Sequence, residues 1–185
     1  MILLIILGVI VLLLLWLVAM YNGFVKAKIK IDNSWSDISV FLKKRFDLIP
    51  NLVNTVKGYA AHESQTLEKV VQARNAAVAV PAGDVQGMAQ ANQVLGGALR
   101  GLLAVAESYP DLKANQNFLE LQQALQSIEG DLGNARRYYN ATVRDYNTSI
   151  QQFPGVVIAR MTGFTPREFF ELDNKEEAKN VEVKF

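Results

Sequence analysis

The first 20 residues form one apolar run. Gly8 is the only residue of this run outside the apolar set, and the first charged side chain is Lys26. Twenty residues of α-helix span roughly 30 Å, the thickness of a bilayer core, and a helix satisfies its own backbone polar groups in lipid. Because no charged segment precedes the run and no clear cleavage site follows it, the pattern predicts an uncleaved transmembrane anchor over residues 1–22 rather than a signal peptide.

After the anchor the apolar residues are spaced three or four apart, which predicts helices. Four such stripes cover residues 35–56, 67–78, 88–109 and 118–153. Pro50 interrupts the first stripe and predicts a kink or break there. The segment Pro81–Asp84 predicts a turn with Asp84 as the N-cap of the third helix. Pro110 is expected to stop that helix, with Asp111 capping the next one.

The fourth stripe alternates steps of three and four and predicts one helix over 111–153. A 3.5-residue repeat is typical of coiled-coil packing, and the pattern leaves open whether the seam is filled within one chain or between chains. The predicted fold class is therefore all-α: an N-terminal transmembrane helix followed by an elongated antiparallel bundle of about four long helices over residues 23–170. Residues 171–185 carry five acids and three bases, which predicts a flexible charged tail.

Composition excludes several function classes. The 185 residues carry 19 Lys and Arg against 18 Asp and Glu, a net charge of +1, which argues against bulk electrostatic binding of nucleic acid. The absence of Cys removes thiol catalysis and Cys-ligated metal sites. A single His excludes a site with several histidine ligands, so neither a metal nor a cofactor is expected.

Several short motifs occur in a fixed order along nearly the whole chain. They are Tyr21-Asn22, Trp35-Ser36, residues 44–53 (KRFDLIPNLV), Val56-Lys57-Gly58-Tyr59 with His62-Glu63, Ala73-Arg74, residues 107–115 (ESYPDLKAN), Tyr139-Asn140, Tyr146-Asn147 and Phe153-Pro154. This set resembles the LemA family of bacterial membrane proteins. The resemblance implies a single-pass N-terminal anchor and a helical bundle. It implies no established catalytic activity.

Two motifs that suggest chemistry are incomplete. His62-Glu63 lacks the second His of a zinc-protease helix, because position 66 is Thr66. A cap or packing contact at a helix corner is the better interpretation. The glycines of residues 96–101 lack the Lys and Ser/Thr of a phosphate-binding loop. Gly97 and Gly101 instead fit close helix approach, within the bundle or between subunits.

Three polar sets leave alternatives open. Arg137, Asn140, Arg144 and Asn147 step along one face of the fourth helix, as a solvated face or as a polar interface to another subunit. Around Pro50, a second set pairs within the chain or meets a partner; it comprises Lys44, Arg45, Asp47, Asn51 and Lys57. Tyr109, Pro110 and Asp111 favour a corner contact, and Trp35 belongs to the first apolar stripe.

No nucleophile–base pair emerges, so the chain is not expected to be an enzyme. The leading hypothesis is a membrane-anchored scaffold that self-associates in the bacterial inner membrane. The alternative is a monomeric or small-oligomer adaptor that binds another envelope protein through its bundle face or tail. Lys26, Lys28 and Lys30 follow the anchor closely, which favours an outside N-terminus and a cytoplasmic domain, with a periplasmic domain as the alternative.

Overall fold

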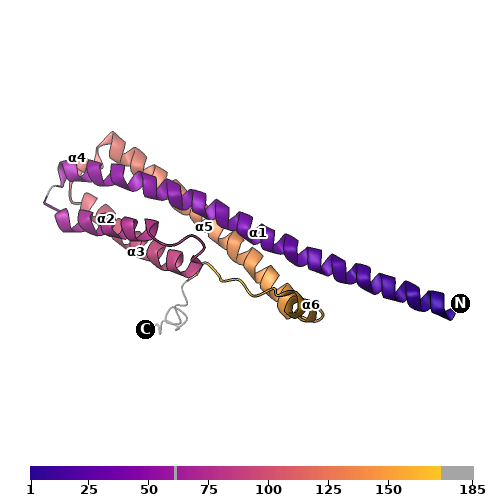
Figure 1. The fold of residues 1–185 in the computed structure, drawn as a ribbon. Helices are drawn as coiled ribbons and strands as arrows, with labels where there is room; N and C mark the ends of the chain where they lie inside the picture. The colour runs from indigo at the N-terminus through magenta and orange to yellow at the C-terminus, as the bar shows by residue number, and fades with distance from the viewer. Residues whose placement is uncertain (61, 172–185) are drawn as a thin grey trace, which may run out of the picture. The chain divides into compact units, whose positions relative to one another are not determined.

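A computed structural model describes residues 1–60 and 62–171, and over these residues the chain is all-helical without a strand (Figure 1). This confirms the predicted fold class. The helices are α1 (Ile2–Tyr59), α2 (Ser64–Val78), α3 (Val85–Ala106), α4 (Pro110–Lys113), α5 (Gln116–Gln151) and α6 (Gly155–Thr162). The expected charged tail lies outside the described residues, apart from Glu171.

Helix α1 joins the apolar N-terminal run to the first predicted helix without interruption. It is the one helix in the described part of the chain that is long and apolar enough to cross a membrane. The predicted break at Pro50 is wrong, because α1 continues to Tyr59. Pro50 has no N–H for the carbonyl of Phe46 one turn earlier. Arg74 of α2 donates to that carbonyl instead, with 3.3 Å between Nε and O.

The expected helix over 111–153 is divided into α4 and α5 by Ala114 and Asn115. Asn115 interrupts it because its side-chain Oδ1 accepts from the backbone N–H of Phe118 at 3.0 Å, as an N-cap does. Asp111 lies in the first turn of α4 and not at its cap position, so the prediction that Asp111 caps a helix is wrong. Tyr109 occupies the cap position of α4, but its side chain makes no capping hydrogen bond, and Pro110 lies in the first turn.

The turn between α2 and α3 is confirmed. Asp84 accepts from the backbone N–H of Gly87 at 2.8 Å and caps α3. Gly83 takes a left-handed conformation with φ 89°, which favours glycine. Because the turn is tight, α2 and α3 pack along each other as a helical hairpin (Figure 1). Helix α6 was not predicted, since its apolar run is too short for a periodicity to show.

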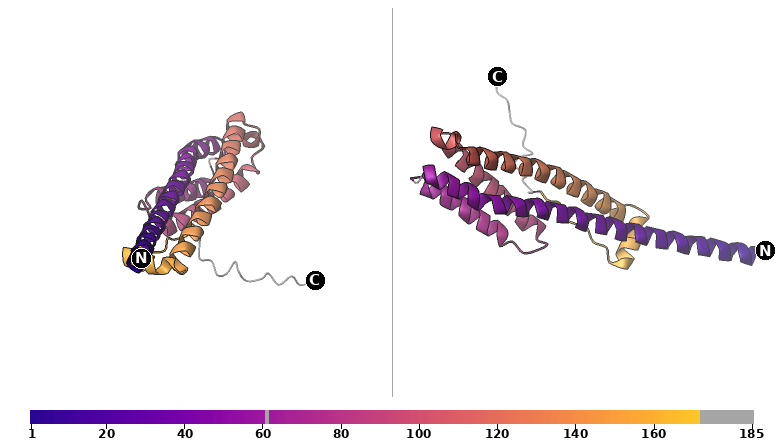
Figure 2. Two further views of the ribbon diagram at one scale, coloured as in Figure 1. Left: turned by 90° about the vertical axis from the view of Figure 1, so that its right-hand side faces the viewer. Right: turned by 90° about the horizontal axis from the view of Figure 1, so that it is seen from above.

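The chain divides into two compact units within α1 and α5. The first unit holds Met1–Arg45 and Leu125–Phe169, and the second holds Phe46–Ala124 and the described residues after 169. In the first unit, α1 and α5 run side by side in opposite directions (Figures 1 and 2). The direction follows from the contacts, because Ser34 meets Thr142 at 3.3 Å between hydroxyl oxygens, whereas Arg45 meets Glu129.

The predicted apolar seam of α5 is buried within this one chain. Buried residues recur every seven positions at Phe118, Leu125, Leu132, Tyr139 and Tyr146, and Thr142, Val143 and Ile150 are buried beside them. The seam is therefore filled within one chain and not between chains, the two alternatives that the sequence pattern left open. A coiled coil between copies of the chain cannot use the same seam in this conformation.

Candidate functional site

An open groove of about 660 Å³ lies along α2 and α3 of the second unit. The lining combines small residues with the longer side chains of Lys69, Gln72 and Val94, and it comprises Thr66, Lys69, Gln72, Ala73, Ala76, Val94, Gly97, Ala98 and Gly101. Val94 is among the exposed large apolar residues of the chain. The groove therefore presents a mostly apolar, small-residue surface that no side chain of the described chain fills.

Gly97 and Gly101 lie on this groove rather than in a helix contact. A Cβ added to Gly101 would meet no atom within 4 Å, and one added to Gly97 would meet only the end of Arg100 at 4.0 Å. Close packing inside the bundle needs an opposing backbone at these positions. That part of the prediction is wrong, because the helix turns its glycines outward. Packing between subunits stays a prediction.

The polar set predicted on α5 has two different environments. Asn140 is buried, whereas Arg137 and Arg144 are exposed. Asn147 is half-buried and holds residues 163–169, here termed the strap, against α5. Its side chain donates to the carbonyl of Arg167 at 2.9 Å and accepts from the N–H of the same residue at 2.8 Å. Asn147 therefore has an intramolecular role, and only the arginines lie on an exposed face.

Two tyrosines of the predicted apolar stripe over 118–153, which also belong to the family-like motifs, hold the strap as well. Tyr139 donates its hydroxyl to the carbonyl of Glu168 at 2.9 Å, and Tyr146 donates to the carbonyl of Thr165 at 3.0 Å. Arg167 further pairs with Asp32 of α1 at 3.1 Å. A signal was present in the sequence, because a tyrosine in a buried seam needs a partner for its hydroxyl.

Burial raises the pKa of both strap tyrosines above the ordinary value of 10.0, although the nearby charge of Arg167 acts in the opposite direction. Both hydroxyls therefore stay protonated and act as donors at neutral pH. Trp35 adds an aromatic contact to this part of the first unit, with its ring centroid 5.5 Å from that of Tyr139. The arrangement holds structure together and offers no reactive group to a substrate.

The polar residues around Pro50 do not all turn inward. Arg45 is buried and pairs with Glu129 of α5, with 2.6 Å between Nη2 and Oε1. Asp47, Asn51 and Lys57 are exposed, as is Lys44, whose ammonium lies 5.4 Å from the ring centroid of Phe41. Glu129 was missed because it lies far away in sequence. No feature of the sequence indicated that Arg45 would be buried.

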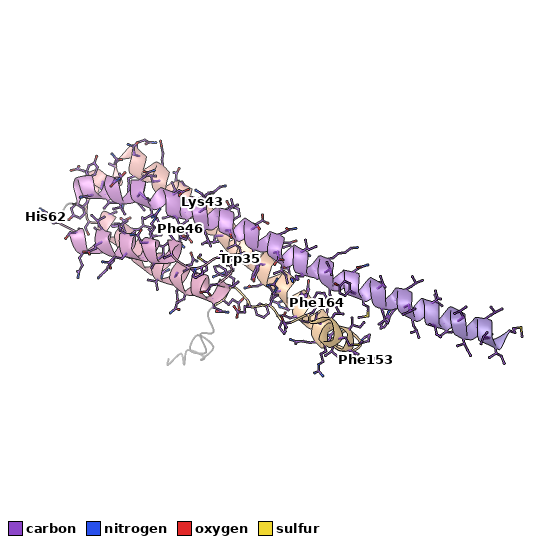
Figure 3. All side chains as sticks on the ribbon, viewed as in Figure 1. Trp35, Lys43, Phe46, His62, Phe153 and Phe164 are labelled. Carbon is purple, nitrogen blue, oxygen red and sulfur yellow. The ribbon has the colours of Figure 1, made fainter. Side chains whose placement is uncertain are left out.

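The corner after α1 brings together other predicted residues. His62 lies exposed in the turn, where Figure 3 labels it, and its neighbour Glu63 accepts from the hydroxyl of Tyr109 at 3.2 Å. This confirms a contact at the corner for Glu63. Burial, together with the hydrogen bond to Glu63, raises the pKa of Tyr109. Asn115 donates to the hydroxyl of Tyr59 at 2.9 Å and ties the same corner to the start of α5.

Among the described residues, no group of three or more His, Asp or Glu side chains is arranged to hold a metal ion. Pro110 and Asp111 are exposed at the start of α4. Features available for interaction with other molecules include the groove of α2 and α3, the exposed arginines of α5 and the apolar N-terminal run of α1.

Comparison with known proteins connects this architecture to a family. The LemA family model matches residues 34–185. Magnetosome protein MamQ 2 of Paramagnetospirillum magneticum is 27% identical over 175 residues, which cover 82% of this chain and 64% of that protein. Magnetosome protein MamQ of Magnetospirillum gryphiswaldense is 25% identical over 174 residues, covering 81% and 64%. Protein LemA of Metamycoplasma hominis is 26% identical over 133 residues, covering 71% and 60%. The chain thus spans less than two thirds of the length of these relatives.

Proposed function

The chain belongs to the LemA family, and from that premise we propose that it is a non-enzymatic helical scaffold, anchored in the bacterial cell membrane, that associates with copies of itself. The anchor is the apolar N-terminal run of α1, whose side chains from Ile2 to Val18 are exposed in the isolated chain. Exposed apolar surface of this extent needs a bilayer or another protein to cover it.

The observation that carries self-association is the open groove of α2 and α3. Gly97 and Gly101 are one turn apart on its surface, and neither meets an opposing helix inside the chain. Residues without a side chain let a second helix approach closely, so a helix from another copy fits here. Anchoring confines all copies to one surface and raises their effective concentration, which makes a weak lateral contact sufficient.

The test is the mass of the full-length protein in mild detergent, measured by light scattering. We expect a uniform assembly larger than a monomer. The double variant Gly97→Leu/Gly101→Leu should shift it to the monomer, because the new side chains fill the groove. A Cβ added at either position meets no described atom closer than 4.0 Å, and Leu favours helix over Gly by about 1 kcal/mol, so we expect the fold to persist.

Gly130→Leu is the matched control. Gly130 is an exposed helical glycine of α5, and a Cβ added to it would meet no atom within 4 Å, so the same change should leave the assembly intact. A chain lacking residues 1–20 would show how far the anchor drives association. A monomeric full-length protein would contradict self-association, and recovery of one envelope protein by crosslinking would then favour the adaptor. An unchanged assembly in the double variant would show that the contact between copies lies on another surface.

A further inference from the structure

Helix α6 lies against α1 directly after the apolar run. The ring of Phe164, which follows α6, is 5.6 Å from the ring of Tyr21 and 5.5 Å from that of Phe24. Gly155 opens α6 so close to α1 that an added Cβ would lie 3.2 Å from the ring of Phe24. Figures 1 and 2 show α6 across the end of α5 that lies toward the N-terminal part of α1.

This contact fixes the height of α6 relative to the anchor. Phe24 lies four residues beyond Met20, which is about 6 Å at a rise of 1.5 Å per residue. A bilayer core of about 30 Å is flanked by headgroup regions that bring the total to about 40–45 Å. If the apolar run fills the core, α6 therefore lies at the depth of the headgroups. Met20 and Ser149 line one shallow pocket, so α5 ends at the same level.

The outer face of α6 is apolar although it is exposed. Phe153, Val157 and Met161 are 85%, 48% and 82% exposed. Val157 and Met161 are four residues apart, which places them on one side of α6, and Phe153 lies in the turn just before the helix. Ile158 and Ala159 are buried on the other side. Figure 3 labels Phe164 near α1 and Phe153 beside α6. An exposed apolar row of this kind marks a binding surface.

Three basic side chains are exposed near this level of the first unit. Lys26 and Lys28 of α1 lie two and four residues beyond Phe24, and Arg160 of α6 is next to Met161 in sequence. Helices with apolar residues on one face and basic residues beside them lie in the interface of membranes that contain anionic lipids.

We propose that α6 is a second membrane contact of this protein: Phe153, Val157 and Met161 insert at the boundary of headgroups and acyl chains in the bilayer that α1 spans. This inference rests on the proposed function, because the height of α6 is counted from the anchor. Basic residues beside the row bind anionic headgroups. The first unit then stands directly on the membrane, held by α1 and α6 together, and cannot tilt freely about α1.

The test uses the full-length protein in vesicles of phosphatidylcholine and phosphatidylglycerol. The chain has no Cys, so single substitutions place one nitroxide label each: Val157→Cys and Met161→Cys on α6, Leu12→Cys in the anchor, and Val40→Cys as the matched control. Val40 is 53% exposed on α1, about 30 Å beyond Met20 along the helix. Power saturation compares collisions of each label with oxygen, which is enriched in lipid, and with an aqueous nickel chelate.

We expect the oxygen-to-nickel ratio to be several-fold higher at positions 157 and 161 than at position 40, and highest at position 12. The same ratio at 157, 161 and 40, with position 12 in lipid, would overturn the contact of α6 and leave the anchor standing. An aqueous label at position 12 would overturn the anchor and the contact of α6 together. Dipolar broadening between labels at 157 or 161, with no depth in lipid, would assign this face to a second copy and also overturn the proposal.

Discussion

Pro50 and Arg74 together determine how α1 continues through its proline. A proline inside a helix leaves one carbonyl without its donor, and an unsatisfied carbonyl weakens the helix there. In this chain the carbonyl is that of Phe46, and the donor that replaces the missing N–H is the Nε of Arg74, 24 residues after Pro50. The helix can continue through its proline because α2 packs beside it and supplies the hydrogen bond.

This explanation predicts an energetic coupling between the two positions. Arg74→Met keeps the apolar stem and should lower the free energy of unfolding by about 1 kcal/mol, since a hydrogen bond of this kind is lost. Pro50→Ala restores the N–H donor within α1, so the same change at Arg74 should cost less in that background. Urea unfolding of the four proteins in mild detergent measures the coupling. An equal cost in both backgrounds would contradict the role given to Arg74.

The strap tyrosines predict a loss of stability at alkaline pH. Burial raises the pKa of Tyr139 and Tyr146 in the folded state, so the unfolded chain loses these protons first as the pH rises. The unfolded state then binds fewer protons, and the free energy of unfolding falls with pH. The contribution of these groups is complete below pH 10 and is lost as the pH rises through the folded-state pKa.

A double variant, Tyr139→Phe/Tyr146→Phe, should show a shallower fall of stability between about pH 8 and about pH 11 than the parent chain. It should also be less stable at the lower pH, because each lost hydrogen bond costs about 1 kcal/mol. Tyr138→Phe is the control, since Tyr138 is an exposed neighbour that keeps its ring beside Lys30. Identical pH slopes in the double variant and the parent would count against this assignment.

At the scale of elements, features set by near neighbours in sequence could be predicted. The cap at Asp84 acts on a backbone group three residues away, and the apolar seam of α5 needs only a repeat. Features set by distant residues could not: the continuity of α1 depends on Arg74, and the strap depends on residues about 20 positions from Asn147. The outward direction of Gly101 depends on how α2 and α3 are rotated against each other, which spacing alone does not specify.

Asn115 stabilises the start of α5, and substitutions at this position test its contribution. Its side chain caps the helix at Phe118 and also donates to the hydroxyl of Tyr59. Asn115→Ala removes both contacts and should lower the free energy of unfolding by about 1–2 kcal/mol. Asn115→Asp keeps the acceptor at the helix N-terminus, where negative charge is favourable, and should recover most of that loss. Urea unfolding compares the two, and equal losses would show that the contact with Tyr59 dominates.

At the scale of the whole molecule, the buried surfaces decide what is left for partners. The seam of α5 is filled within the chain, and Asn147 is occupied by the strap. For the proposed self-association this leaves the groove around Gly97 and Gly101 and the exposed Arg137 and Arg144 on α5 as candidate surfaces. Reversing the charge of Arg144 should leave the assembly mass unchanged if the groove is the contact, whereas a smaller assembly would bring the arginine face into the interface.

The orientation of α1 in the membrane decides on which side the helical domain lies. Lys26, Lys28 and Lys30 lie on α1 just beyond the apolar run, and basic residues so close to a membrane span stay on the cytoplasmic side. We therefore expect the helical domain in the cytoplasm. Green fluorescent protein fused to the C-terminus should fluoresce, and alkaline phosphatase fused there, which is active only in the periplasm, should be inactive.

Substitution of the three lysines by Gln tests the cause of this orientation. If these charges set it, the triple variant should gain phosphatase activity and lose fluorescence, because the charge bias across the span is removed. The control replaces Lys57, Lys69 and Lys113, which are equally exposed but lie beyond the stretch that influences insertion; it should behave as the parent chain. An active phosphatase on the unaltered chain would reverse the orientation and place α2 and α3 in the periplasm. Association through the groove would then occur outside the cytoplasm, while the contact of α6 would move to the opposite leaflet with its geometry unchanged.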